Sequence, residues 1–147
     1  MAESGFQARK REEYKDMPES VEFDVEEIRR QLNTDKEWVL AARYWYARIR
    51  FSVGSDRYFM HVEDGKVVDF VAATQGFDPY GIDIGGPAEV WEKMLRPIPP
   101  AYCQSFLPAQ LFHGLTLGGD LSAIYAHYAA LERILVVMRR CCNAIAA

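Results

Sequence analysis

The sequence pattern places three side chains that can exchange protons next to apolar residues: Glu132, Asp69 and Tyr128. Glu132 lies one helical turn after Tyr128 within an apolar stripe, so its carboxylate needs a cationic partner or a cavity wall. Arg48 or Arg50 could provide that partner in a structural ion pair, or Glu132 could lie at an exposed edge of the helix. At a cavity wall, an unpaired carboxyl group would have a raised pKa and could act as a general base on an activated C–H bond.

Asp69 and His61 fall on adjacent predicted strands and can face each other across them. Pointing inward, they would form an acid/base pair; pointing outward, they would form a cross-strand surface pair, which is the commoner arrangement. The three histidines are too scattered to ligate one metal within a single element, and the three cysteines lack CxxC spacing. We therefore expect no metal and no cofactor.

The sequence contains no nucleophile elbow, P-loop, HExxH motif or dinucleotide-binding fingerprint. Gly118-Gly119 resembles a phosphate cradle, but the carboxylate of Asp120 follows at once, repels phosphate and suits a helix N-cap instead. We do not expect a self-sufficient enzyme of a standard motif class.

Composition favours one domain with an apolar interior. The 147 residues suffice for a single domain, and 50% of them are hydrophobic and 13% aromatic. This is more bulky apolar material than a minimal core needs, so part of it can line a cavity. The net charge of -4 provides no cationic field for a phosphate backbone, and we expect no nucleic-acid partner.

The first part of the chain differs from the rest. Residues 1–20 are polar, contain Pro18 and Ser20, and are predicted to form a flexible arm, with residues 21–147 as a single ligand-binding domain. The arm has no apolar segment of the secretory type, and the longest strongly apolar run, Ile134 to Met138, is too short to cross a bilayer. These features predict a cytoplasmic protein with no integral membrane segment.

The hydrophobic periods predict segregated helices and strands, and hence an α+β fold. Asp64-Gly65 suits a type I′ turn between two strands, and Thr34 with Glu37 suits a capping box that opens a helix. The predicted helices are 25–32, 34–43, 87–95, turns within 102–112, and a long terminal helix from Asp120 to Arg140; the predicted strands are 47–53, 57–62, 66–73, 82–84 and 115–117.

Three segments carry a resemblance to a known family. They are Val62-Glu63-Asp64-Gly65-Lys66-Val67-Val68, Ile82-Asp83-Ile84-Gly85-Gly86-Pro87-Ala88-Glu89-Val90-Trp91, and Gly114-Leu115-Thr116-Leu117-Gly118-Gly119-Asp120. In content and order, these segments resemble the sterol carrier protein type-two domain family, in particular its compact bacterial members.

The resemblance implies a twisted, mostly antiparallel five-stranded sheet covered on one face by helices, with a long C-terminal helix. It also implies a hydrophobic tunnel between sheet and helices that takes sterols, fatty acyl chains or other apolar molecules. We expect the ligand-binding residues to be Phe51, Tyr58, Phe70, Trp91, Met94, Tyr102, Phe106, Tyr125 and Tyr128. Trp91, Tyr125 and Tyr128 are predicted to point inward and meet at one wall, where a tyrosine hydroxyl can orient a polar ligand end.

Three functions stay open. The protein binds an apolar small molecule as a carrier or sequestering module, or it is a proton-transfer enzyme (isomerase, cyclase or hydratase) that uses Glu132, Asp69 or Tyr128, or it is a structural dimer. A carboxylate projecting into an open cavity would favour the enzyme, and a fully packed interior would favour the structural dimer. Extra apolar area at Val136 and Val137, beside the stripe of the last helix, predicts a homodimer.

Overall fold

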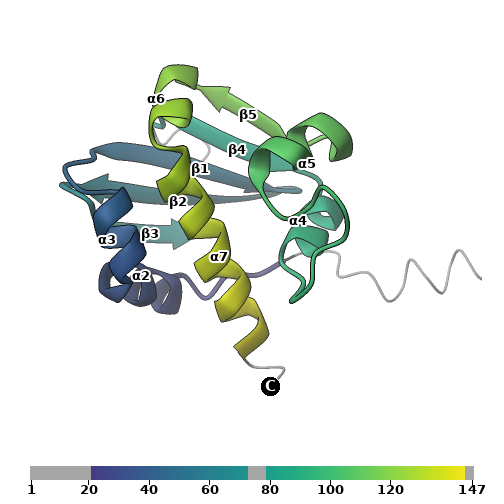
Figure 1. The fold of residues 1–147 in the computed structure, drawn as a ribbon, viewed down its shortest axis with the longest axis horizontal. Coiled ribbons are helices and arrows are strands. Elements are labelled where there is room, and N and C mark those ends of the chain that lie inside the picture. Colours follow the sequence, from purple (N-terminus) through teal and green to yellow (C-terminus); the bar gives the residue numbers. More distant parts are fainter. Residues whose placement is uncertain (1–20, 73–78, 145–147) are drawn as a thin grey trace, which may run out of the picture.

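One five-stranded sheet organises the molecule. A computed structural model describes residues 21–72 and 79–144, and Figure 1 shows helices packed over the sheet. The strands are β1 (Ala47–Val53), β2 (Asp56–Glu63), β3 (Lys66–Ala72), β4 (Ile82–Gly86) and β5 (Thr116–Gly119). They lie in the order β3-β2-β1-β4-β5, with only the β1–β4 pair parallel. The predicted α+β class and mostly antiparallel sheet are confirmed.

Six helices accompany the sheet in the described ranges. They are α2 (Val25–Thr34), α3 (Lys36–Ala41), α4 (Ala88–Met94), α5 (Phe106–His113), α6 (Leu121–Ala126) and α7 (Tyr128–Ala144). The long α7 crosses in front of the sheet and packs against α2 and α3 (Figure 1). No described helix has both the length and the apolar character needed to span a membrane.

The strand pattern explains why helices cover one face. In β1, Ile49, Phe51 and Val53 are buried, whereas Arg48, just before them, is exposed and Arg50 is only partly buried. Asp69 of β3 is likewise exposed and lies directly opposite His61 of β2, on the same uncovered face. Because alternate strand residues point to opposite faces, the apolar set of each strand meets the helices and the polar set meets solvent.

The turn between β2 and β3 forms as the Asp64-Gly65 pair predicts. Both residues have positive φ, 48° and 75°, as a type I′ turn requires. A Cβ atom on Gly65 would lie 2.7 Å from the carbonyl oxygen of Ala42, and the Gly65 amide donates to the Trp45 carbonyl at 2.9 Å. Only glycine allows this turn to pack against the segment that follows α3.

Two helix boundaries differ from the prediction. The N-cap of α3 is Asp35, whose carboxylate accepts from the amides of Glu37 and Trp38, while the Thr34 hydroxyl donates to carbonyls within α2. The terminal helix is broken at His127, the C-cap of α6. The prediction that Tyr125 points inward is wrong: Tyr125 is 61% exposed, and the buried residue of α6 is its neighbour Ile124, which lies about 100° away around the helix.

The surface proposed for dimer contact is also different. Val137 is fully buried among the core residues of α7, and Val136 is only partly exposed. The prediction that both valines leave extra apolar area beside the main stripe is therefore wrong for Val137, because this residue belongs to the buried face of α7.

Candidate functional site

Trp91 stands at the centre of the space between sheet and helices. Its buried indole contacts three rings edge-on, at centroid distances of 6.1 Å for Phe51, 6.1 Å for Phe106 and 6.0 Å for Phe23. Such edge-to-face contacts add to the energy of burying the rings. The residues thus come from β1, α4, α5 and the segment before α2, four parts of the chain that only the fold brings together.

Two further rings extend this group along the sheet. Phe70 lies 6.1 Å from Phe51 and 6.2 Å from Tyr58, and Tyr58 lies 4.9 Å from Phe23. We call this set the aromatic cluster: Phe23, Phe51, Tyr58, Phe70, Trp91 and Phe106. Five of its members are residues that the sequence predicts to bind ligand, and Met94, a sixth predicted residue, is fully buried on the same helix as Trp91.

Phe23 is the member that the sequence analysis missed. It is 8% exposed although it belongs to no helix or strand. A signal for it does exist: Phe23 directly precedes Asp24, the N-cap of α2, and Ile28 follows at the spacing of a hydrophobic staple. That pattern places an apolar side chain against the core just before a helix begins.

The polar ends of the buried rings are bound to the backbone. The Trp91 indole nitrogen donates to the Ser52 carbonyl at 2.9 Å, and the Tyr58 hydroxyl donates to the Val21 carbonyl at 3.4 Å. The Leu107 amide donates to the Tyr128 hydroxyl at 3.0 Å. Burial raises the pKa of both tyrosines, and the neighbouring Glu132 carboxylate adds to the rise at Tyr128. These hydroxyls stay neutral at physiological pH.

Tyr102 and Tyr125 lie outside the aromatic cluster. Tyr102 is 51% exposed, and its ring stacks on the exposed ring of Phe112 with 4.2 Å between the centroids. Tyr125 projects from α6 into solvent. The segment between α4 and α5, which carries Tyr102, is hydrogen-bonded to α7. Arg139 donates to the carbonyls of Met94 and Gln104, and Asn143 donates to the Leu95 carbonyl.

Of the three residues predicted for proton transfer, Tyr128 and Glu132 are neighbours on α7, and Asp69 lies apart from them. Asp69 is exposed on the uncovered face of the sheet, whereas Tyr128 and Glu132 lie on α7 over the other face. Glu132 borders a surface groove of about 310 Å³ between α3 and α7. Its expected pairing with Arg48 or Arg50 is wrong, because both arginines lie on the uncovered face, where Arg50 pairs with Asp83 at 2.9 Å.

A second groove, of about 470 Å³, lies beside the segment that carries Phe23. We call it the N-terminal groove; it lies between that segment, the end of α4 and the end of α7. Its walls combine apolar Val21, Leu95 and Pro97 with the thiols of Cys141 and Cys142. Neither this groove nor the one beside Glu132 has Trp91 among its lining residues, so within the described ranges both lie outside the aromatic cluster.

Comparison with known proteins bears on the fold. No protein-family model matches the sequence, and no curated protein matches it significantly. Among solved structures, a crystal structure of sterol carrier protein 2 superposes with a TM-score of 0.65 at 18% identity, covering 80% of this chain and 94% of that one.

Two further structures agree. A Thermus thermophilus protein described as possibly a sterol carrier protein gives a TM-score of 0.66 at 16% identity over 84% of this chain and 90% of its own. A ubiquinone synthesis protein named UbiJ-SCP2 gives a TM-score of 0.50 at 15% identity over 76% and 90%. Together with the strand order and the long C-terminal helix, these superpositions show that the chain has the fold of the sterol carrier protein type-two domain.

Proposed function

We propose that this protein binds an apolar small molecule, sterol-like, fatty acyl or aromatic, between the sheet and the helices, as a cytoplasmic carrier or sequestering module. The aromatic cluster is the observation that carries the proposal. Its rings gather between sheet and helices from distant parts of the chain, in a fold shared with a protein named sterol carrier protein 2. Such apolar walls with a few fixed polar groups are typical of small-molecule sites.

Phe23 is the part of the cluster that a ligand can displace. Its ring meets Tyr58 and Trp91 edge-on, and its backbone lies outside the sheet and helices, so moving it breaks no strand pairing. The other five cluster members belong to helices or strands. We propose that an apolar chain takes the place of the Phe23 ring against Trp91.

The N-terminal groove fits the role of an entrance to that position. It shares Val21 and Glu22 with the segment that carries Phe23, and its far wall includes Leu95 and Cys142. Burial raises the pKa of the Cys142 thiol to about 11, so this thiol stays uncharged at neutral pH. The groove also has four charged lining residues, Glu22, Asp24, Glu92 and Arg96, so a lipid chain would approach Phe23 along its apolar residues Val21, Leu95 and Pro97.

A fluorescence titration tests the proposal. We expect cis-parinaric acid to bind saturably, to quench Trp91 emission and to have a micromolar or tighter dissociation constant, about 8 kcal/mol of binding free energy. Phe23→Ala should tighten binding about tenfold, because the ligand no longer has to displace a buried ring. Phe59→Ala removes a ring of the same type from β2, opposite Arg50 on the uncovered face, and should leave the affinity unchanged.

The packed interior supports a second candidate, the structural homodimer. Trp91, Phe51 and Phe106 each have 0% exposed surface, which is the fully packed interior that a structural role predicts. Sedimentation at micromolar protein concentration checks whether the dimer forms. Absence of saturable cis-parinaric acid binding by both the parent chain and Phe23→Ala would contradict the carrier and favour the structural role.

A further inference from the structure

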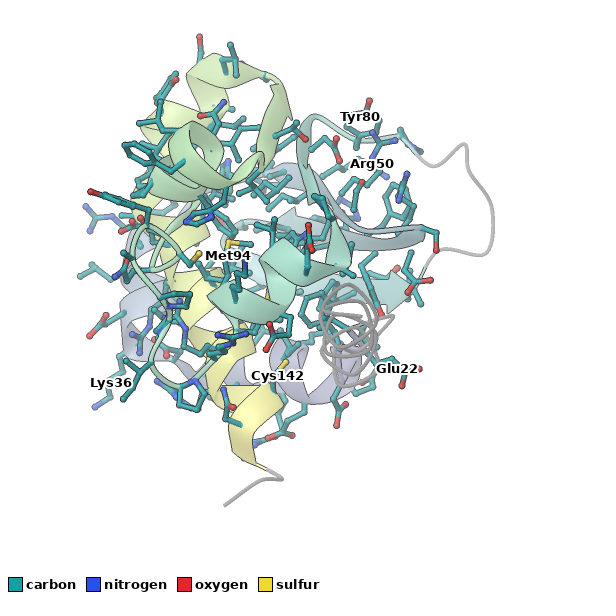
Figure 2. The ribbon with its side chains drawn as sticks, turned by 90° about the vertical axis from the view of Figure 1, so that its right-hand side faces the viewer. Glu22, Lys36, Arg50, Tyr80, Met94 and Cys142 are labelled. Carbon is teal, nitrogen blue, oxygen red and sulfur yellow. The ribbon has the colours of Figure 1, made fainter. Side chains whose placement is uncertain are left out.

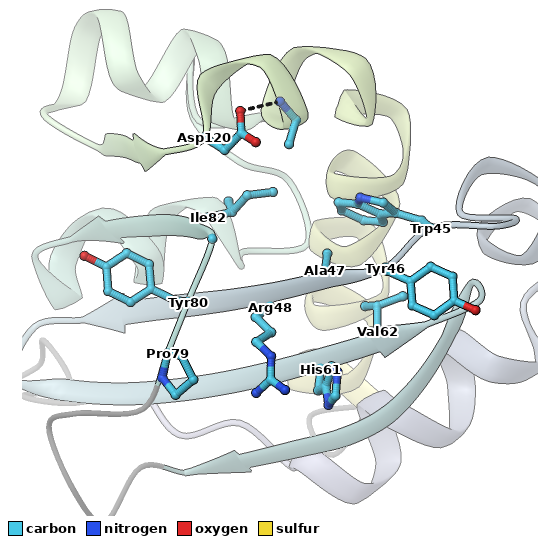
Figure 3. Close-up of a pocket in the computed structure, with 12 residues that line it drawn as sticks. Trp45, Tyr46, Ala47, Arg48, His61, Val62, Pro79, Tyr80, Ile82 and Asp120 are labelled. Carbon is cyan, nitrogen blue, oxygen red and sulfur yellow. Dashed lines mark hydrogen bonds between the residues drawn. The ribbon is translucent and has the colours of Figure 1, made fainter.

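A pocket of about 390 Å³ lies at the end of the sheet where β1 and β4 begin and β2 ends. We call it the sheet-end pocket. Tyr46, Arg48, His61, Tyr80 and Asp120 contribute its polar and aromatic groups (Figure 3). None of these residues belongs to the aromatic cluster, so the pocket is distinct from the interior site proposed above. Its volume falls within the range of small-molecule sites.

Close backbone packing fixes one wall of this pocket. Gly119 has a φ of 87°, and a Cβ atom there would lie 2.2 Å from the carbonyl oxygen of Gly81. Without that atom, the Asp120 amide donates to the same carbonyl at 2.7 Å, while the Gly81 amide donates to the Arg48 carbonyl at 2.9 Å. The start of α6, the segment before β4 and the start of β1 are thereby held together around the pocket.

The pocket has a cationic side. Arg48 makes no ion pair within 4.0 Å to any described residue, whereas the next arginine in the strand, Arg50, pairs with Asp83 and lies 3.8 Å from the centre of the Tyr80 ring. His61 lies directly opposite Arg48 in the β1–β2 register and adds a second nitrogen-bearing side chain. Figure 2 shows Arg50 and Tyr80 together at the same side of the molecule. A carboxylate entering here meets a guanidinium that none of the described acidic side chains pairs with.

The rest of the pocket is aromatic, with one acidic group. Tyr46 is 69% exposed and Tyr80 is 42% exposed, and they border opposite ends of the pocket with Arg48 and His61 between them (Figure 3). Trp45 is buried and stacks on His127 at 4.5 Å, which makes it a fixed wall. Asp120 stands across the pocket, with one carboxylate oxygen bound to the Ala123 amide.

We propose that the sheet-end pocket binds a small planar aromatic acid. The carboxylate of the ligand pairs with Arg48, its ring lies against the exposed tyrosines, and a hydrogen-bond donor at its other end points to Asp120. The two charged side chains then select for orientation, because a ligand bound in reverse would place its carboxylate against Asp120. This site does not depend on ligand binding in the interior.

Indole-3-acetate is a suitable probe, because it combines a carboxylate, a planar ring and an N–H donor. The readout is the set of three tryptophan indole N–H signals in a proton–nitrogen NMR spectrum, assigned by Trp→Phe variants. Trp45 lines the pocket, whereas the Trp38 and Trp91 indoles are bonded to the Gly65 and Ser52 carbonyls elsewhere. We expect saturable shifts of the Trp45 signal and of the Gly81 and Ala123 amides.

Arg48→Gln should weaken the binding of indole-3-acetate about tenfold, the usual loss for one hydrogen bond to a charged group. Arg57→Gln is the matched control: Arg57 lies at the opposite end of β2 and bonds to the Gly54 and Asp56 carbonyls, so its loss should not change the affinity. The neutral analogue indole-3-acetamide should bind about tenfold more weakly than the acid.

Three results would overturn the proposal: no saturable shift at Trp45, Gly81 or Ala123; equal binding of acid and amide; or an unchanged affinity in Arg48→Gln. Shifts confined to Trp91 would place the probe in the interior, which contradicts this site while supporting the interior carrier. Cis-parinaric acid that shifts Trp91 and leaves Trp45 unmoved would show that the two sites are separate.

Discussion

The hydroxyl and indole N–H groups of the buried aromatic side chains show how much can be predicted for a single residue. Tyr58, Trp91 and Tyr128 each have a hydrogen-bond partner for their polar group. The sequence indicates only that a buried hydroxyl or indole N–H needs such a partner. It does not indicate which, because the partners are backbone groups far away in the chain: Leu107 lies 21 residues from Tyr128, and Ser52 lies 39 residues from Trp91. Consequently Tyr128 has a structural partner within the protein, and a ligand-orienting role for its hydroxyl stays a prediction.

Replacing Tyr128 by Phe tests that partner. Ser105, the N-cap of α5, makes no side-chain cap hydrogen bond, so the Tyr128 hydroxyl accepts from an amide that a cap would ordinarily satisfy. We expect Tyr128→Phe to cost about 1 kcal/mol of unfolding free energy and to lower the melting temperature by about 2 to 4 °C. Tyr125→Phe removes an exposed hydroxyl and should leave the melting temperature unchanged. Equal melting temperatures for Tyr128→Phe and the parent would contradict the capping role.

At the scale of elements, local signals predict the strands well and the helix boundaries less well. Alternation in 47–53 and the turn at Asp64-Gly65 specify β1 and the β2–β3 hairpin, because both depend on neighbours in sequence. The break at His127 has no local signal of the Gly or Pro type. It depends on how α6 packs near β4 while α7 packs against α2 and α3, which are contacts between distant residues.

Asp35 joins two elements and makes stability depend on pH. It caps α3 and also accepts a two-pronged hydrogen bond from Arg133 of α7, the closest contact being 2.8 Å, with only 6% of its side chain exposed. The hydrogen bond from Arg133 holds the pKa of Asp35 below its ordinary value, and the amides of Trp38 and Glu37 contribute in the same direction. The carboxylate therefore stabilises the fold fully above about pH 4, and this contribution is lost as pH falls through the lowered pKa.

Asp35→Asn keeps the cap and removes the charge. We expect the substitution to lower the free energy of unfolding by about 1 to 3 kcal/mol at pH 7, and this difference from the parent should shrink below about pH 4. Urea unfolding at several pH values measures it. Glu26→Gln is the control, since Glu26 is 73% exposed and its one ion pair with a described residue is to Arg29; it should cost less than about 0.5 kcal/mol. If the free energies of unfolding of Asp35→Asn and the parent differ by a constant amount down to pH 2, ionisation of Asp35 does not contribute to stability as described.

Gly119 tests the contact between β5, α6 and the segment before β4. Its left-handed backbone alone should make Gly119→Ala cost about 1 to 3 kcal/mol, and the approach of the new methyl group to the Gly81 carbonyl adds to this. Gly118→Ala is the control, because a Cβ there has no atom within 4 Å. Thermal unfolding of both variants measures the difference; equal stabilities would show that the sheet-end packing is looser than the structure indicates.

For the whole molecule, the order of individually weak segments predicted the fold correctly. The β2–β3 turn, the strand before Trp91 and the Gly-Asp opening of the last helical region recur in the structure as β2–β3, β4–α4 and β5–α6. Core residues such as Phe51 and Trp91 follow from the alternation and the helical spacing. How completely the interior is filled could not be predicted, because Phe23 reaches the cluster from outside every regular element and only the assembled fold sets that distance.

Ligand-linked stability is the prediction that tests the molecule as a unit. A ligand that binds only the folded chain stabilises it by about 2.7 kcal/mol at a hundredfold excess over its dissociation constant. For a chain of 147 residues, this corresponds to a rise in melting temperature of about 5 to 10 °C. We expect palmitate to produce that rise in the parent. Phe23→Ala should start from a lower melting temperature, because a buried ring is lost, and should show a larger rise at the same palmitate concentration.

Arg48→Gln should respond to palmitate as the parent does, since Arg48 lies in the sheet-end pocket and not in the interior. A melting temperature that palmitate leaves unchanged in both the parent and Phe23→Ala would show that the aromatic cluster is a closed core.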